Sequence, residues 1–217
     1  MKILIATCAF ALFYVVCLSL LSTKLKWQDR FLMMVLCIFT ILIGTRNGWP
    51  DQGVYEIAFN EAPLPWEINW FGEIYGYAEH GYLLLASIVK LIYNNVTFYF
   101  LAMGGLSMFL LYKGLKMYSA IPLLGLCDYA GRFLLNRDFQ QMRSSLAILL
   151  LILAIKLIHD RKLVAYMLVV LLAYQFHHLS LLGIPLYFLY KVRIGPISII
   201  FSLVMAMLLS QLLAGSI

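Results

Sequence analysis

Long apolar runs fill most of this chain, and they restrict its possible folds more than any other feature. The runs at 3–22, 31–45 and 144–158 carry at most one charged residue each. A helix needs about 20 predominantly apolar residues to cross a bilayer. Of the 217 residues 64% are hydrophobic and 12% are charged, whereas about a quarter of a soluble domain is charged. This balance excludes a water-soluble globule and a disordered chain.

We therefore predict an all-α polytopic integral membrane protein that forms a single multi-span domain over residues 1–217. It should contain about eight transmembrane helices. The predicted spans are 3–22, 31–45, 96–112, 119–135, 144–158, 163–178, 180–190 and 196–213. The basic clusters between spans are Lys24/Lys26/Arg30, Lys113/Lys116, Arg161/Lys162 and Lys191/Arg193. One transmembrane topology places all four clusters in the cytoplasm, as expected because cytoplasmic loops carry an excess of lysine and arginine.

That topology requires residues 79–93 not to cross the membrane. The stretch is apolar but short and carries Lys90, so we predict a re-entrant or interfacial helix. Residues 46–79 then form an outer, periplasmic loop, which holds six of the ten acidic residues. Its tryptophans and tyrosines are either membrane-interface anchors or platforms on which sugar rings stack.

Four arginines depart from the expected placement of positive charge inside. Arg46, Arg132, Arg137 and Arg143 all fall at or near the outer face. Arg132 has a local partner in Asp128, four residues earlier on the same predicted helix. The others favour a cavity that binds an anion, since guanidinium holds phosphate or carboxylate through two hydrogen bonds. Snorkelling of these side chains to lipid headgroups is the alternative.

Histidines supply the candidate acid–base chemistry. His177 and His178 end the predicted span 163–178 at the outer face, where one of them can face a cavity. His80 follows Glu79 at the start of the short helix and is placed in the same outer site. No nucleotide-binding glycine motif, H-E-x-x-H or C-x-x-C is present, so we expect no cofactor and no metal. Lysines and arginines are dispersed along the chain without a basic run, which argues against nucleic acid as a partner.

Four short segments together are similar to a known family. They are G-T-R-N-G-W-P-D-Q-G-V-Y at 44–55, E-H-G-Y at 79–82, Q-M-R-S-S-L-A at 141–147 and H-H-L-S-L-L-G-I-P-L at 177–186. Their order and residue types resemble the EpsG-like, Wzy-type polymerases of bacterial surface polysaccharides. Members of that family are usually longer, so we expect either a short member or a truncated chain.

The resemblance implies a polymerase of undecaprenyl-pyrophosphate-linked oligosaccharide repeat units for O-antigen, capsule or exopolysaccharide. It would lie in the bacterial inner membrane with its active site facing the periplasm or cell exterior. The implied partners are lipid-linked oligosaccharides, membrane lipids, a chain-length regulator and a flippase. A flippase or exporter of lipid-linked sugars, and a non-catalytic subunit of a polysaccharide assembly complex, are the alternatives.

The resemblance also implies roles for particular residues. Arg143, with Arg137 and Arg46, would stabilise the pyrophosphate leaving group. His178 or His177 would be the general base, with Asp51 as the second candidate. The remaining implied substrate-binding residues are Tyr55, Glu79 and His80.

Overall fold

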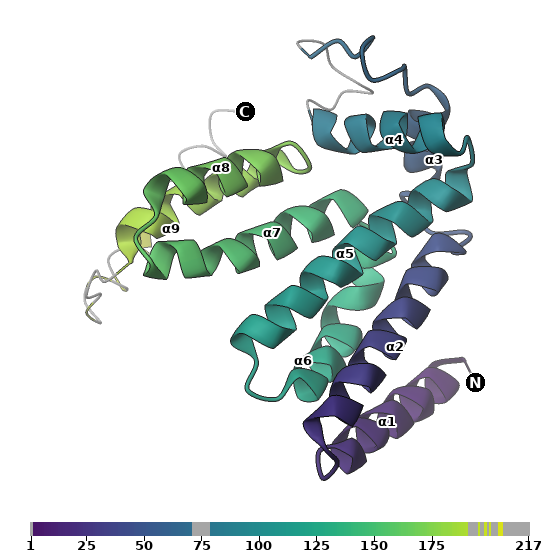
Figure 1. Cartoon of the computed structure of the whole chain (residues 1–217), viewed down its shortest axis with the longest axis vertical. Coiled ribbons are helices and arrows are strands. Elements are labelled where there is room, and N and C mark those ends of the chain that lie inside the picture. Colours follow the sequence, from purple (N-terminus) through teal and green to yellow (C-terminus); the bar gives the residue numbers. More distant parts are fainter. Residues whose placement is uncertain are drawn as a thin grey trace.

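The computed structural model describes residues 2–70 and 79–190, together with positions 195, 198, 200, 204 and 205. Every regular element in these ranges is helical (Figure 1). The elements are α1 (Lys2–Leu20), α2 (Leu25–Gly44), α3 (Gln52–Asn60), α4 (His80–Ile92), α5 (Val96–Tyr118), α6 (Pro122–Tyr129), the π-helix η1 (Ala130–Asp138), α7 (Met142–His159), α8 (Leu163–Tyr174), the 3-10 helix η2 (His178–Gly183) and α9 (Ile184–Leu189).

Three helices are long and apolar enough to span a membrane. They are α2, α5 and α7, with 20, 23 and 18 residues. The prediction of a helical membrane protein is confirmed, but the described residues do not support eight spans. The short helix predicted over 79–93 is present as α4, which has 13 residues. Its position relative to the membrane, and the outer location of residues 46–79, stay predictions.

Several predicted spans are broken into shorter pieces. The segment 119–135 becomes α6, which begins at Pro122 and has eight residues, followed by η1. The segment 163–178 is a helix only to Tyr174, and 180–190 is divided between η2 and α9. Proline suits the first turn of a helix, so Pro122 and Pro185 start new helices inside apolar sequence. Most of the predicted span 196–213 lies outside the described residues.

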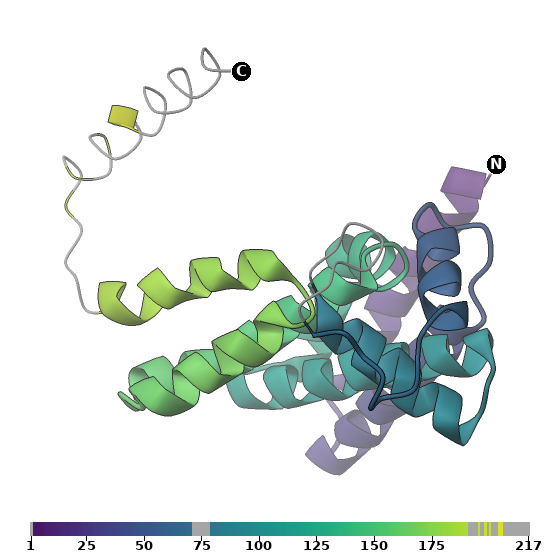
Figure 2. The same ribbon diagram turned by 90° about the horizontal axis from the view of Figure 1, so that it is seen from above.

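Close packing of α2 against α5 depends on small residues. A Cβ atom on Gly104 would lie 2.9 Å from Ile43, and one on Gly44 would overlap Leu101. Glycine at such positions lets two helices approach without a side chain between them. Helix α7 packs on α5 and also on α8, so it joins the α2–α5 pair to the C-terminal helices (Figures 1 and 2).

The packing of α7 against both α5 and α8 brings three helix ends close together. The first residues of α4 and α7 lie beside the end of α8 (Figure 1). Residues 79–82, 142–145 and 174–178 are far apart in the sequence, and each belongs to a different helix terminus. The polar side chains that the sequence carries at these termini are therefore brought together.

Candidate functional site

The carboxylate of Glu79 is the centre of the candidate site. Glu79 directly precedes α4, and its side chain is 1% exposed. One carboxylate oxygen accepts a hydrogen bond from Nη1 of Arg143 at 2.6 Å. The other lies 2.7 Å from Nδ1 of His178 and 3.4 Å from Nδ1 of His177. A buried charge is costly unless it is paired and hydrogen-bonded, and these partners meet that requirement.

Backbone contact between α4 and α8 positions this carboxylate. The N–H of Gly81 donates to the carbonyl oxygen of Gln175 at 2.6 Å. That carbonyl is one of the acceptors that a helix end leaves without an intrahelical donor. A Cβ atom on Gly81 would lie 2.6 Å from the same oxygen, so only glycine permits the approach.

Aromatic rings surround the guanidinium of Arg143. Its Cζ atom lies 5.1 Å from the ring centroid of Tyr82 and 5.8 Å from that of Tyr55. Attraction between a cation and an aromatic face adds to the ion pair with Glu79. The Arg143 side chain is 15% exposed, so it is held firmly and still reaches the surface. Tyr55 was predicted at the site, whereas Tyr82 was noted only as the last residue of the E-H-G-Y segment and was given no role.

The two histidine side chains differ in how much of their surface is exposed. The side chain of His178 is 53% exposed and that of His177 is 25% exposed. A carboxylate at Nδ1 favours the tautomer with the proton on that nitrogen, which leaves Nε2 of His178 as an acceptor. Burial lowers the pKa of His177, an effect that Glu79 opposes. This arrangement suits His178 for accepting a proton from a bound group.

The same three residues could hold a metal ion. The ligand atoms of Glu79, His177 and His178 all lie within 4.8 Å of one another. Imidazole and carboxylate are common zinc ligands. The positive charge of Arg143 on the same carboxylate disfavours a second cation, and both Nδ1 atoms already face Glu79. The expectation that no metal binds here stays a prediction.

Arg46 is buried near this cluster rather than within it. Its Nη1 atom donates to the carbonyl oxygens of Phe139 and Asp138 at 2.8 and 3.2 Å. The guanidinium lies 4.4 Å from the ring centroid of Phe100 and 5.5 Å from that of Tyr55, the ring that Arg143 also faces. Its Nε and Nη2 atoms are buried and have no hydrogen-bond partner among the described residues. Burial lowers the pKa of Arg46, although arginine stays charged at neutral pH.

Arg137 and Asp138 are adjacent in sequence but have different partners. Nη1 of Arg137 donates to Gln141 and Ser144 at 2.7 and 3.0 Å. Asp138 is 1% exposed. It accepts hydrogen bonds from the hydroxyls of Tyr129 and Ser145, both at 2.6 Å. Burial raises the pKa of Asp138 to about 6.

Sequence reasoning missed the network of Asp138, Tyr129 and Ser145. None of these three residues was among the predicted site residues. A carboxylate between apolar segments of a membrane protein is itself a signal, because such groups are expensive to bury. The π-helix η1 brings Tyr129 and Asp138 together, and its wide turns cannot be read from residue types.

The contacts of two other predicted site residues, His80 and Asp51, differ from those of the Glu79 cluster. His80 is buried, its Nε2 lies 3.0 Å from the carbonyl oxygen of Asn69, and its ring contacts Trp70. It therefore contacts the end of the described segment 61–70. Asp51 precedes α3 without capping it, and it has no ion pair in the described part of the chain. The predicted pair of Arg132 and Asp128 is confirmed, at 2.8 Å.

A known family matches most of this chain. A model of the EpsG family matches residues 29–216, a range that includes Glu79, Arg143, His177 and His178. No curated protein and no solved structure matches the chain. The family accounts for a helical membrane protein connected with polysaccharide biosynthesis. With nearly the whole sequence matched, this chain belongs to the EpsG family.

Proposed function

We propose that this protein polymerises lipid-linked oligosaccharide repeat units in the synthesis of a bacterial surface polysaccharide. The observation that carries the proposal is the buried Glu79 carboxylate, which binds Arg143 through one oxygen and His178 through the other. A base and a cation are thereby fixed beside each other at one end of the membrane helices. Transfer of a glycan from a pyrophosphate carrier needs both groups.

In this proposal His178 is the general base. Glu79 orients the imidazole through Nδ1 and stabilises the imidazolium that forms, so Glu79 is a positioning residue. Nε2 of His178 then removes the proton from a hydroxyl of the acceptor sugar. Asp51, the second candidate from the sequence, has no comparable contact with the arginines. Its side chain does not cap α3 and takes part in no ion pair among the described residues.

The N-terminus of α7 is the proposed binding site for the pyrophosphate. The first turn of α7 contains no acidic residue, and Gln141 does not cap it through its side chain. The helix dipole therefore favours an anion there. Arg143 lies in that first turn, and Arg137 is hydrogen-bonded to Ser144 in the same turn. The nearby Arg46, whose Nε and Nη2 are unpaired within the described part of the chain, is a third source of positive charge.

The proposed reaction balances without a metal or cofactor. The acceptor hydroxyl oxygen bonds to the anomeric carbon of the growing chain, and the bond from that carbon to the pyrophosphate oxygen breaks. The electron pair leaves with the lipid pyrophosphate, whose charge the arginines stabilise. The hydroxyl proton passes to His178. Exposed Trp66 and Trp70, in the loop before α4, are available for stacking against sugar rings.

Complementation of a strain that lacks this gene tests the proposal. Wild-type protein should restore the ladder of polymer lengths on a polysaccharide gel. His178→Ala and Arg143→Lys should leave a single repeat unit, because lysine cannot replace a planar guanidinium. His159→Ala and Arg132→Lys are matched controls, since both residues are exposed and lie outside the site. Immunoblots of the membrane fraction establish equal amounts of each variant.

The same gels separate the alternatives. If His178→Ala and Arg143→Lys restore a full ladder, the proposed chemistry is wrong. If the strain without the gene carries no repeat unit at its surface, the protein exports lipid-linked sugars instead. If purified protein alone in liposomes makes no polymer from lipid-linked repeat units, while a second membrane protein added to it does, this chain is a non-catalytic subunit.

A further inference from the structure

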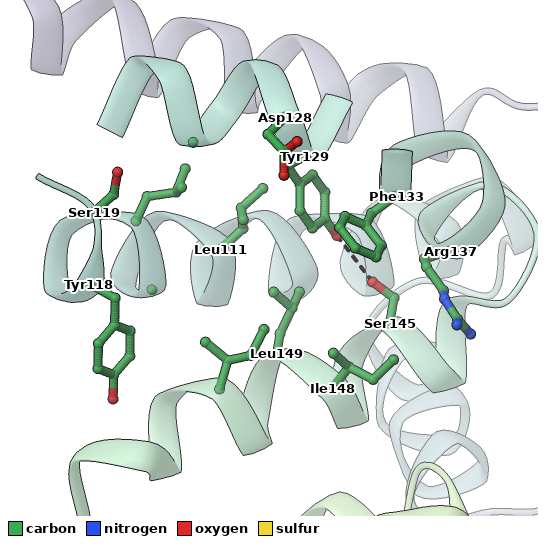
Figure 3. Close-up of a pocket in the computed structure, with 14 residues that line it drawn as sticks. Leu111, Tyr118, Ser119, Asp128, Tyr129, Phe133, Arg137, Ser145, Ile148 and Leu149 are labelled. Carbon is green, nitrogen blue, oxygen red and sulfur yellow. Dashed lines mark hydrogen bonds between the residues drawn. The ribbon is translucent and has the colours of Figure 1, made fainter. Parts of the chain in front are cut away.

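A cavity of about 350 Å³ lies between α5, α6, η1 and α7 (Figure 3). Its volume is within the range of sites that bind small molecules. Its lining includes Leu111, Gly114, Tyr118, Phe133, Arg137 and Ile152. We call it the α5–α7 cavity. None of the residues around Glu79 lines it.

The wall of this cavity is apolar and reachable from the surface. Leu111, Leu115 and Leu149 form its buried part, whereas Tyr118, Phe133, Ile148 and Ile152 are each more than one third exposed. Two of its four helices, α5 and α7, are candidate membrane spans. With α5 and α7 in a bilayer, an apolar cavity that opens between them would face hydrocarbon, and a ligand could enter from the lipid.

Charge is distributed unevenly along the cavity. Figure 3 shows Arg137 at one end and Tyr118 at the other. Within the described ranges 2–70 and 79–190 both hydrogen bonds of Arg137 use Nη1, and the side chain has no ion pair. Asp128 also lines the cavity, but its carboxylate pairs with Arg132 at 2.8 Å. The cavity is thus complementary to a molecule with an apolar chain and one anionic end.

We propose that the α5–α7 cavity binds the isoprenoid chain of a polyprenyl-phosphate lipid, with its phosphate at Arg137. The inference rests on the proposed function, which requires a lipid carrier. A phosphate at Arg137 would lie beside Ser144, the residue after Arg143 in the first turn of α7. The carrier's phosphates would thus be held at the α7 terminus while the tail occupies the cavity. The rings of Tyr129 and Phe133 offer faces for the flat alkene units of the chain.

Glycine on α5 allows the tail contact to be tested without removing a side chain. A Cβ atom on Gly114 would lie 3.8 Å from Ile152 across the cavity, which is an ordinary contact. Gly114→Leu should therefore fill the end near Tyr118, one turn further along α5. Gly105→Leu is the matched control. A Cβ atom on Gly105 would lie 3.6 Å from the Thr40 side chain of α2, and Gly105 lines a different cavity.

Binding is measured on the full-length protein in detergent with undecaprenyl phosphate, undecaprenol and geranyl phosphate. Gly114→Leu should weaken binding of undecaprenyl phosphate at least about tenfold and leave geranyl phosphate unchanged, because the short chain does not reach the blocked end. Gly105→Leu should bind both as wild type does. Arg137→Gln should weaken both phosphates and leave undecaprenol unchanged.

Three results would overturn the proposal. One is wild-type affinity of Gly114→Leu for undecaprenyl phosphate with a normal melting temperature. Another is equal loss of phosphate and alcohol binding in Arg137→Gln. The third is mass spectrometry of the purified protein showing a phospholipid, not a polyprenyl lipid, that Gly114→Leu displaces. None of these assays requires turnover, so loss of the polymerase proposal alone would leave the binding results intact.

Discussion

Gly81 and Gln175 join the start of α4 to the end of α8 through one backbone hydrogen bond of 2.6 Å. Glu79 lies two residues before Gly81, and His177 and His178 lie two and three residues after Gln175. This single contact therefore sets the distance between the carboxylate and both histidines. The bond joins main-chain atoms only, and it requires a residue without a Cβ atom at position 81.

We predict that Gly81→Ala lowers polymer synthesis by about 100-fold or more while the protein remains folded in the membrane. The added Cβ would lie 2.6 Å from the Gln175 oxygen, which forces the two helix ends apart. A displacement of about 1 Å at a catalytic group is enough for such a loss. Gly53→Ala is the matched control, because no atom of the described residues lies within 4 Å of its Cβ position. Normal activity of Gly81→Ala would show that the site tolerates this movement.

Breaking the buried ion pair should destabilise the protein strongly. Glu79→Gln and Arg143→Met should each lower the free energy of unfolding by about 3 kcal/mol or more, because each leaves one uncompensated charge. The double variant should lose less than the sum of the two. Thermal unfolding in detergent measures all three.

The exposed pair of Asp128 and Arg132 provides the comparison for that experiment. Its side chains are mostly exposed, so Asp128→Asn should change stability by at most about 0.5 kcal/mol. Additive losses at Glu79 and Arg143 would mean that the two side chains are not coupled in solution.

The two histidines should differ in their effect on rate. His178→Ala should reduce the rate of polymerisation about 100-fold or more and flatten the acid limb of the pH–rate profile, as expected when a general base is lost. His177 lies 3.4 Å from Glu79 and is less exposed, so His177→Ala should cost less than about tenfold and keep that limb. The reverse order of effects would make His177 the base.

Asp138 should make the protein more stable in mild acid. Its folded pKa of about 6 exceeds the ordinary value of 3.8, so the folded state binds more protons between these values. The resulting stabilisation is present below pH 4 and is lost as pH rises through 6; the shift corresponds to roughly 3 kcal/mol at most.

Asp138→Asn should remove this pH dependence, because the amide does not titrate. The measurement is the difference in melting temperature between pH 5 and pH 7.5 for wild type and variant. An unchanged difference in the variant would place the titration on another group.

Chelation should leave activity intact. Glu79, His177 and His178 approach one another closely enough to ligate zinc, but Arg143 already neutralises the carboxylate. Purified protein treated with EDTA should therefore polymerise lipid-linked repeat units at the untreated rate. Loss of activity that zinc restores, together with one equivalent of bound zinc by elemental analysis, would reassign the three residues as metal ligands.

The sequence alone determined the class of this protein, its main membrane helices and its family. Composition and the length of apolar runs are sufficient for α2, α5 and α7, because a bilayer demands long apolar helices. They are insufficient for 119–135 and 180–190, where apolar residues continue across helix ends that Pro122 and Pro185 help to set. Residue types near helix ends also identified Arg143, His177 and His178 as candidates, since charged groups in such segments need partners.

Only the tertiary structure decided which of those candidates meet. Glu79 is 64 positions from Arg143 and 99 from His178, and no local spacing links residues so distant. For the same reason, sequence position alone did not show that Nε2 of His80, the residue after Glu79, lies 3.0 Å from the carbonyl oxygen of Asn69. Glu79 needs its partners because it is buried. Burial results from the packing of helices and cannot be predicted from the residue type alone. The identities of the charged groups are local, and their pairing is a consequence of the packing of α4, α7 and α8.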